Sequence, residues 1–505
     1  MPPTNGYLVV LTADRTLMGD YPTLLDGMMG TIQTTAGAPE LVMRRFLSPR
    51  IPCRDGRALK APLGLRRIEA LLRADGLSES QVAIVPPEEL AGAIGPATRV
   101  VGACSGDPLG QGMSNTTMIA MCKGSLYTAR WYAELMSEIR WLRESNPNFR
   151  VLAGGPGAWQ LANQPKLAAE LGIDTIFTGY AERDGAKVFR RLIDGEAVEP
   201  VVQGARAELE DIPPILGATS MGVVEISRGC GRGCGFCTLA REPMFHLPVE
   251  HVVADADTNL RAGVQSLALI SEDFLRYGST TTEVEPEALL TLLRSVRILP
   301  DLRMIQVDHV NVSSVMQYTP QQLREVREAM TAGARHEQPW VNMGVESASG
   351  ELMMKAGLGG KVHPFSADQW PLLCERAVLR LIEAGFVPMV SLVMGLPGET
   401  VEHVEQTIEL IRRFFGRRLV VFPIFYAPLD PAEHAFGLED MTPQHWRLFR
   451  MAYDLNFQWI PPMFWDNHRA AGAPMWRRLF IQSAGQVQKL QWKLKFALAT
   501  GKLHA

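Results

Sequence analysis

The stretch Ile226-Ser-Arg-Gly-Cys230-Gly-Arg-Gly-Cys234-Gly-Phe-Cys237 gathers three of the chain's seven cysteines within eight residues. Their spacing is C-x3-C-x2-C, which chance would supply with an expectation of about 0.001 in a chain with this cysteine content. The intervening Gly231, Gly233 and Gly235 let the backbone turn tightly enough for three sulfurs to converge. Because thiolates at this density bind soft metals, the stretch predicts a metal centre.

Three sulfurs are one fewer than a structural zinc site or an ordinary iron–sulfur cluster takes from its protein. The stretch follows a strand-like run, 223–227, and resembles the radical S-adenosylmethionine (SAM) superfamily. In that family a C-x3-C-x-aromatic-C loop holds a four-iron four-sulfur (4Fe–4S) cluster, whose free corner binds SAM. The resemblance implies that Cys230, Cys234 and Cys237 bind the metal and that Phe236 is the aromatic residue beside the cofactor. The alternative is a zinc knuckle that borrows a histidine such as His246.

Length and composition describe a globular chain of two or three domains, with 505 residues, 47% hydrophobic and 21% charged. A net charge of −4 does not indicate the basic surface that nucleic-acid-binding proteins use. Clustered cysteines fit a reducing compartment. The start, Met-Pro-Pro-Thr-Asn-Gly, lacks the pattern of a signal peptide, and there is no run of eighteen apolar residues. We therefore expect a cytoplasmic protein without a membrane span.

Residues 1–204 alternate strand-like and helix-like segments. Strands are expected at 7–12, 81–85, 99–103, 150–155 and 174–177, and helices at 64–74, 127–144, 167–171 and 185–193. This alternation predicts an α/β fold with a doubly wound, Rossmann-like parallel sheet. Ligands of such sheets bind beyond the carboxyl ends of the strands.

The segments VLAGGPGAW and GIDTIFTGYAERDGAKVFRRLIDG, which begin at Val151 and Gly172, resemble the cobalamin-binding domain of cobalamin-dependent radical SAM enzymes. The resemblance implies that strand-end loops hold cobalamin through Ser105, Asp107, Gly154, Gly155, Gly157, Gly179 and Glu182. The D-x-H-x-x-G string that supplies a cobalt-binding histidine is missing from this region, and a similar string from Asp466 to Gly472 is one residue too long. The resemblance thus implies cobalamin without a protein histidine on cobalt. A degenerate sheet kept for docking or substrate binding is the alternative.

A linker at 205–217 is expected to lead into a barrel over 218–430. Six strands are predicted at 223–227, 266–270, 304–308, 340–345, 388–394 and 419–425. Thr319 and Pro320 have the features of a helix N-cap and first turn. Six βα units fall short of a closed eightfold barrel, and match the partial (β/α)6 barrel of the radical SAM family.

The resemblance also assigns residues that follow these strands to SAM binding. Ser271, Glu272 and Asp273 would receive the methionine amino group, Glu346 and Ser347 would contact the ribose and carboxylate, and Gly395 to Gly398 would pack against the adenine. Thr400 is expected to cap the next helix. The loop after Glu346 is looser than in relatives, which leaves the roles of Lys355 and Lys361 open.

Residues 431–505 are expected to form a small helical domain that is rich in aromatic residues. Core packing is the favoured interpretation of these aromatic residues, and a wall over a substrate is the alternative. The segment 488–496 is a basic amphipathic helix that could touch a membrane or an acidic partner, although this pattern is usually a solvated face.

The leading hypothesis is a radical SAM enzyme with a 4Fe–4S cluster and SAM. It would be a cobalamin-dependent methyltransferase that acts on an unactivated carbon of a small molecule or peptide and takes electrons from a flavodoxin or ferredoxin. A second hypothesis is a radical cyclase, rearrangement enzyme or oxidoreductase, with or without cobalamin. A methylthiotransferase would need a second cluster, for which Cys53, Cys104 and Cys122 are available but unsuitably spaced. The last alternative is a non-catalytic iron–sulfur protein. The sequence identifies no catalytic residue.

Overall fold

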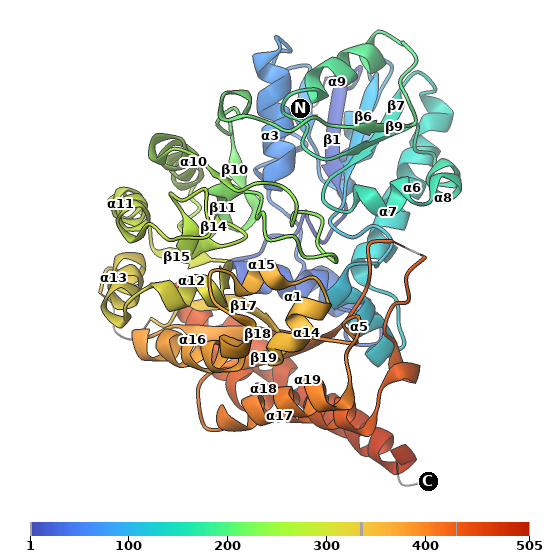
Figure 1. Ribbon diagram of the computed structural model, residues 1–505. Coiled ribbons are helices and arrows are strands. Elements are labelled where there is room, and N and C mark those ends of the chain that lie inside the picture. Colours follow the sequence, from blue (N-terminus) through green and yellow to red (C-terminus); the bar gives the residue numbers. More distant parts are fainter. Residues whose placement is uncertain (1–2, 334–336, 431, 504–505) are drawn as a thin grey trace. The chain divides into compact units, whose positions relative to one another are not determined.

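The computed structural model describes residues 3–333, 337–430 and 432–503 (Figure 1). The chain folds into two compact units. The first comprises Met1–Val223 and Ala254–Val264, and the second Val224–Val253 and Gln265–Ala505.

A six-stranded parallel sheet with the order β5-β1-β6-β7-β8-β9 forms the centre of the first unit. Its strands are β1 Val9–Ala13, β5 Val82–Ile84, β6 Val100–Cys104, β7 Arg150–Gly154, β8 Thr175–Thr178 and β9 Val201–Gln203. The first five agree with the prediction. The sequence prediction missed β9, a short and mostly exposed edge strand without the apolar run that identifies the others.

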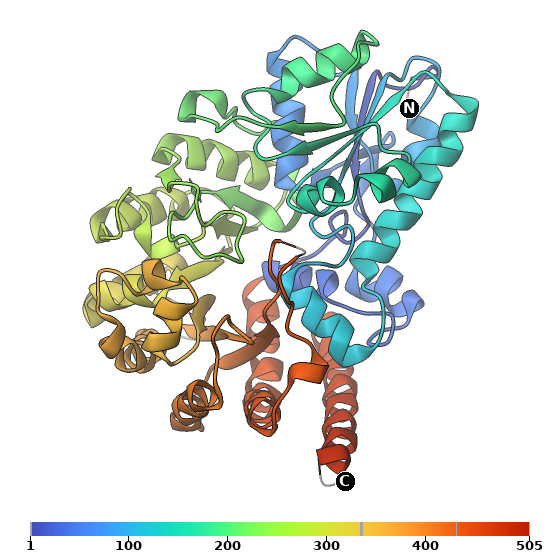
Figure 2. The same ribbon diagram turned by 45° about the vertical axis from the view of Figure 1, so that its right-hand side comes forward.

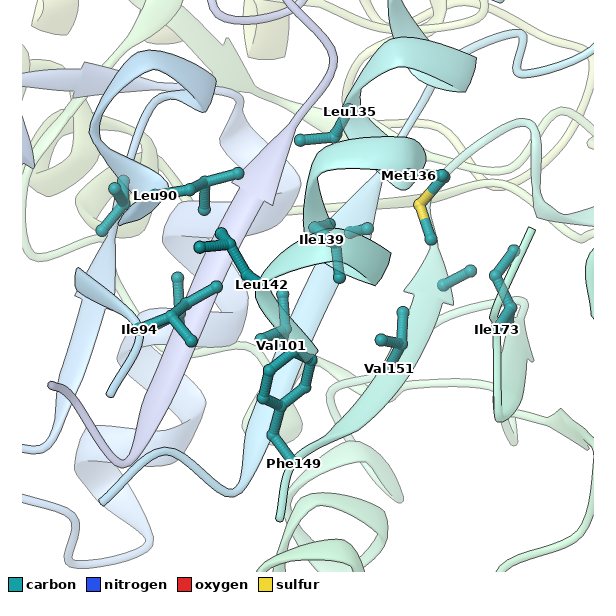
Figure 3. Close-up of a cluster of buried hydrophobic side chains, with 14 of the residues drawn as sticks. Leu90, Ile94, Val101, Leu135, Met136, Ile139, Leu142, Phe149, Val151 and Ile173 are labelled. Carbon is teal, nitrogen blue, oxygen red and sulfur yellow. The ribbon is translucent and has the colours of Figure 1, made fainter. Parts of the chain in front are cut away.

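Strand residues alternate between two hydrophobic clusters, because successive side chains of a strand point to opposite faces. Helix α6 (Tyr127–Ser145) covers one face and contributes Leu135, Met136 and Ile139, which lie beside Val101 and Val151 of the sheet (Figure 3). Helices α3 (Leu63–Ala74) and α9 (Gly185–Ile193) cover the other face (Figure 1). Two helical layers around a parallel sheet confirm the predicted α/β class.

Several elements of the first unit were not predicted. They include α1 (Leu24–Thr31), α5 (Met113–Cys122) and the hairpin of β2 (Cys53–Arg54) with β3 (Arg57–Ala58). Helix α1 contains Gly27 and Gly30, and α5 mixes apolar and hydroxyl residues, so neither shows a clear helical period.

The predicted linker at 205–217 belongs to the first unit. Ile215 N donates to Asp255 Oδ1 at 2.9 Å, and the Arg67 guanidinium lies 2.5 Å from Asp255 Oδ2 and donates to Pro213 O. Strand β10 (Ala218–Thr219) then pairs with β4 (Lys60–Ala61). A buried ion pair between residues 188 positions apart thus fixes a segment that the sequence presents as a spacer.

The second unit contains two parallel sheets, with the orders β11-β14-β15 and β16-β17-β18-β19. The strands are β11 Val223–Glu225, β14 Ser266–Ile270, β15 Met304–Val307, β16 His309–Asn311, β17 Trp340–Glu346, β18 Val387–Met394 and β19 Val420–Phe425. All six predicted strand positions are present, with the third broken at Asp308. Its longer helices are α11 Pro286–Arg297, α13 Pro320–Thr331, α16 Trp370–Ala384, α17 Val401–Arg413, α18 Pro443–Ala470 and α19 Met475–Leu503.

Two predicted helix starts are confirmed. The Thr319 hydroxyl accepts a hydrogen bond from Gln322 N, Pro320 is the first helical residue of α13, and Thr400 is the N-cap of α17.

The carboxyl-terminal helices are part of the second unit rather than a separate one. Asn456 of α18 accepts a hydrogen bond from Val421 N at 2.8 Å and donates one to Val421 O at 2.7 Å. A side chain thus provides hydrogen-bond partners for the backbone at the outer edge of β19. Phe449, Tyr453, Trp492 and Phe496 pack between α18 and α19, so core packing accounts for these four residues, whereas Trp476 is exposed. No described helix is both long enough and apolar enough to cross a membrane.

Replacing Arg67 by Met should lower the free energy of unfolding of the first unit by about 3–5 kcal/mol, because the substitution leaves Asp255 buried without its partner. Urea denaturation followed by circular dichroism measures this change. Replacing the exposed Arg54 by Met is the matched control and should change little. A loss below about 1 kcal/mol for Arg67→Met would show that the pair does not hold the 205–217 segment.

Candidate active site

The cysteine loop leaves β12 (Ser227–Arg228) and turns at Gly229, Gly231 and Gly233, whose φ angles are 77°, 72° and 76°. These left-handed conformations favour glycine. Gly235, which the sequence suggested as a turning point, has no such angle. Backbone bonds from Cys230 N to Glu242 O and from Gly233 N to Ala240 O close the loop at 2.9 and 2.8 Å.

Arg232, between the first two cysteines, anchors the loop. Its buried guanidinium donates to Asp273 Oδ2 at 2.9 Å, to Ser313 and Ser314 at 3.0 and 3.1 Å, and to Gly360 O at 2.8 Å. Asp273 also accepts from Ser314 Oγ and Asn311 N. One arginine therefore connects the cysteine loop to the ends of β14 and β16 and to α15 (Gly359–Val362).

Burial raises the pKa of each of the three cysteine thiols, that of Cys234 to about 11. Arg232 opposes this rise at Cys230, and the Lys361 ammonium opposes it at Cys234 and Cys237. Metal ligation needs thiolates, and a bound cation supplies the charge that favours them. Three glycine-spaced thiols in a closed loop fit the donor set of an iron–sulfur cluster.

The alternative of a zinc site requires His246 as the fourth ligand. In the structure, His246 Nε2 lies 2.7 Å from Ser279 O. Within the described ranges, no three His, Cys, Asp or Glu side chains are close enough together to bind a single metal ion. Cluster ligation by Cys230, Cys234 and Cys237 therefore stays a prediction.

Of the three predicted residues after β14, only Glu272 has a carboxylate available for a ligand. Ser271 Oγ lies 2.6 Å from Ser227 Oγ, and the Asp273 oxygens are occupied as described. In the described part of the chain Glu272 has no hydrogen bond or ion pair, and burial raises the pKa of its carboxyl. An unpaired, largely buried carboxylate beside the cysteine loop is suited to receive a cationic group.

Asp308 and His309, at the break between β15 and β16, were not identified from the sequence. His309 Nδ1 lies 2.9 Å from Asp308 Oδ1, which also accepts from Asn342 Nδ2 at 3.1 Å. Burial opposes the positive charge, but Asp308, followed by Glu272, raises the pKa of His309 to about 9. The break that turns both side chains toward each other leaves no spacing signal in the sequence.

Glu346, the last residue of β17, has a φ of 61°, which is strained for a residue with a side chain. Its carboxylate forms an ion pair with Lys361, and a Cβ on Gly344 would collide with both groups. Burial lowers the pKa of Lys361, but Glu346, followed by Cys234, raises it overall above its ordinary range. Backbone strain, a required glycine and a buried ion pair together make this strand end a candidate functional position.

Three residues on β17, β18 and β19 are partly exposed within strands that are otherwise mostly buried. Gly344, Ser391 and Phe422 are neighbours in register and are partly exposed, whereas the residues next to them in each strand are mostly buried. Neighbours in register point to the same face, so this face of the sheet is open.

Ser347 does not point into this open face. Its side chain is buried, its hydroxyl accepts from Ser349 N, and its carbonyl accepts from Trp370 Nε1 at 2.8 Å. We therefore assign Ser347 to positioning of the loop after β17.

Gly395 and Gly398 line a cavity of about 600 Å³ formed by the loop after β18, by Tyr426 and by residues between Glu433 and His445. Both have positive φ, and Gly395 N donates to Glu399, which His445 Nε2 contacts at 2.9 Å. Tyr426 lines the same cavity and packs edge-on against Phe236, with ring centroids 6.4 Å apart. Phe236 therefore connects the cysteine loop to this cavity.

In the first unit, Asp107 organises the loop after β6. Its two carboxylate oxygens accept hydrogen bonds from Gln111 N, Gly112 N, Gln160 Nε2 and Asn115 Nδ2. Because these donors occupy the carboxylate, the aspartate shapes the loop and is not open to a ligand.

The predicted glycines of this unit differ in their surroundings. A Cβ on Gly155 would approach Cys104 Sγ at 2.5 Å, and Gly157 N donates to Ser105 O at 3.1 Å, so the loops after β6 and β7 pack on each other. Gly155, Pro156 and Gly179 are nevertheless exposed at this edge, while Gly154 is partly exposed and Glu182 is buried. The exposed positions after β7 and at the end of β8 thus carry small side chains or none.

The Radical SAM superfamily model matches residues 224–411, so the second unit contains a radical SAM domain. Such a domain implies a 4Fe–4S cluster and SAM as cofactors.

Three curated relatives are methylthiotransferases. The ribosomal protein uS12 methylthiotransferase RimO of Myxococcus xanthus is 28% identical over 44% of this chain and 42% of its own, and RimO of Microcystis aeruginosa is 25% identical over 56% and 61%. A threonylcarbamoyladenosine tRNA methylthiotransferase of Danio rerio is 24% identical over 46% and 40%. This chain thus spans about half the length of these relatives.

Two structures of the radical SAM methyltransferase TsrM from Kitasatospora setae share the fold. One contains cobalamin and a [4Fe–4S] cluster, with a TM-score of 0.54 and 15% identity over 84% of this chain and 74% of TsrM. The other contains tryptophan and a SAM analogue, with a TM-score of 0.54 and 14% identity over 88% and 83%. At this identity the likeness concerns the fold alone.

Replacing Cys230, Cys234 and Cys237 together by Ala should abolish the brown absorbance of anaerobically reconstituted protein, because no other cysteine group can hold the cluster. Iron analysis should fall from about four per chain to near zero. Replacing the buried Cys374 by Ala is the control and should leave the iron content unchanged. Retention of iron by the triple variant would refute the assignment.

Proposed function

We propose that this protein, whose residues 224–411 match the radical SAM superfamily, is a cobalamin-dependent methyltransferase that acts on an unactivated carbon of a small molecule or peptide. One observation carries the proposal. The likeness to TsrM extends over at least 84% of the chain and so includes the amino-terminal sheet, whereas the three methylthiotransferases align with at most 56%.

Different residues of the second unit would have different roles in SAM binding and cleavage. The cluster, once bound, would supply the electron that cleaves SAM. Glu272 would receive the methionine amino group, since its carboxylate is unpaired, and Glu346 with Lys361 would orient the ribose and carboxylate. Arg232 would hold the loop in place through Asp273. The open face of the sheet, arranged as a partial barrel, would admit the substrate.

The sheet of the first unit would bind cobalamin, which would supply the methyl group. The chain runs from β1 to β5 on one side and then crosses to β6 on the other side of β1, so the switch point lies between β1 and β6. Ligands of open α/β sheets bind beyond the carboxyl ends at such points. The exposed edge at Gly155, Pro156 and Gly179, after β7 and β8, would receive the wide planar ring, because its side chains are small or absent. Reduction would come from a flavodoxin or ferredoxin.

A methylthiotransferase is the second candidate, because the curated relatives above have this activity. It would need a second cluster in the first unit. Cys104, however, lies in β6 within the hydrophobic core, where burial raises its thiol pKa to about 12. The two candidates differ in iron content, with about four irons per chain for one cluster and about eight for two. A halved iron content in Cys104→Ala or Cys122→Ala would favour the methylthiotransferase.

Replacing Glu346 by Gln should weaken SAM binding about tenfold or more, because a charge-assisted contact is lost and Lys361 loses its partner. Iron content should not change, since Glu346 does not bind the cluster. Equilibrium dialysis with labelled SAM measures the affinity, and Glu383→Gln, at an exposed position of α16, is the matched control. Unaltered affinity in the Glu346 variant would show that the strand end is assigned wrongly.

Replacing Pro156 by Trp should reduce the cobalt retained after incubation with hydroxocobalamin, because the indole occupies the exposed edge of the sheet. Pro156→Ala tests the loss of proline alone. Ala197→Trp adds the same bulk at an exposed position between α9 and β9, at the opposite edge. Both controls should retain cobalt, and full retention by Pro156→Trp would place the corrinoid elsewhere.

A further inference from the structure

Helix α19 (Met475–Leu503) has two apolar faces. Helix α19 packs on α18. Its inner face carries the buried side chains of Ile481, Trp492 and Phe496. The helix ends near the carboxyl terminus marked in Figure 2. Trp492 lies over Tyr453 of α18, with ring centroids 4.3 Å apart. Packing on α18 therefore accounts for the inner face.

The outer face carries a second row of apolar side chains. We call this row the outer stripe; it comprises Trp476, Leu479, Val487, Leu490, Leu494 and Leu498, which are 54% to 75% exposed. At 100° per residue these positions fall within an arc of about 100°. Single exposed apolar residues are ordinary, but a continuous row along one helix marks an interaction surface.

The charges of this helix have one sign. Between Met475 and Leu498 the sequence has five basic residues and no acidic one, although the whole chain has a net charge of −4. Helical geometry places the exposed Lys493 beside one edge of the outer stripe, and Lys489 and Lys495 farther round the helix toward the inner face. Lys489 Nζ lies 3.4 Å from Phe457 O, and Lys495 lies over the Trp492 ring, so both lysines stay close to the helix pair.

We propose that the outer stripe is a binding surface for an anionic lipid bilayer. Its apolar side chains would enter the boundary between headgroups and acyl chains, the exposed Lys493 beside the stripe would extend to the phosphates, and the net positive charge of the helix would favour an anionic surface. A second copy of this chain fits less well, because two such helices would bring like charges together. A flat bilayer accommodates a straight helix of about 36 Å, which is the length of 24 residues, without a complementary groove.

Flotation of the purified full-length protein with vesicles tests the proposal. Binding should be weak to phosphatidylcholine alone, strong when phosphatidylglycerol is added, and reduced by salt, because screening weakens attraction between the lysines and the headgroups. Replacing Leu490 and Leu494 by Asp should lower the bound fraction at least about tenfold. Lys493→Glu should lower it several-fold.

The matched control is Ile298→Asp, which removes an equally exposed apolar side chain after α11 and should leave binding unchanged. Circular dichroism and iron content show whether each variant is folded. The proposal is overturned if phosphatidylglycerol does not increase the bound fraction of the wild-type protein, or if the double variant still floats with the vesicles. It is also overturned if Leu490→Asp/Leu494→Asp dissociates a dimer of the wild type in the ultracentrifuge, because a second copy would then cover the stripe. None of these outcomes depends on methyl transfer.

Discussion

The buried ion pair between Arg232 and Asp273 is the constraint on which the site depends. Its side chains are 1% and 0% exposed, and they join the cysteine loop to the end of β14. The same guanidinium donates to Gly360 O, next to the lysine that pairs with Glu346. The cysteine loop and two strand ends thus share one anchor. A shift of the loop would break a buried charge pair, which costs several kcal/mol.

Glu272 and Asp273 are adjacent but have different roles. Asp273 is saturated with hydrogen bonds and holds the loop, while Glu272 has no partner in the described chain and is left for a ligand. Likewise Glu346 forms an ion pair with Lys361 at the end of β17, whereas Ser347 is buried in the loop that follows. Neighbouring polar residues at a strand end thus divide into one that faces a ligand and one that supports the backbone.

Local sequence patterns predicted the elements that are determined by residues close together in the chain. Cysteine spacing located the site, Thr319 and Pro320 located a helix start, and apolar runs located eleven strands. Features that depend on distant partners were missed. The Asp308–His309 pair is produced by a strand break, the role of Arg232 needs groups up to 128 residues away, and Arg67 reaches Asp255 across 188 positions. Loop contacts also reassign Asp107 from a proposed ligand to a loop organiser.

Elemental analysis of the full-length protein most directly tests the claim that one chain joins a corrinoid-binding sheet to a radical SAM domain. The protein would be purified anaerobically from cells grown with hydroxocobalamin, and cobalt and iron would be measured in the same sample. The proposed function predicts about one cobalt and four irons per chain, with cobalt retained in the variant without Cys230, Cys234 and Cys237. Iron without cobalt would contradict it and leave a radical enzyme that works without cobalamin.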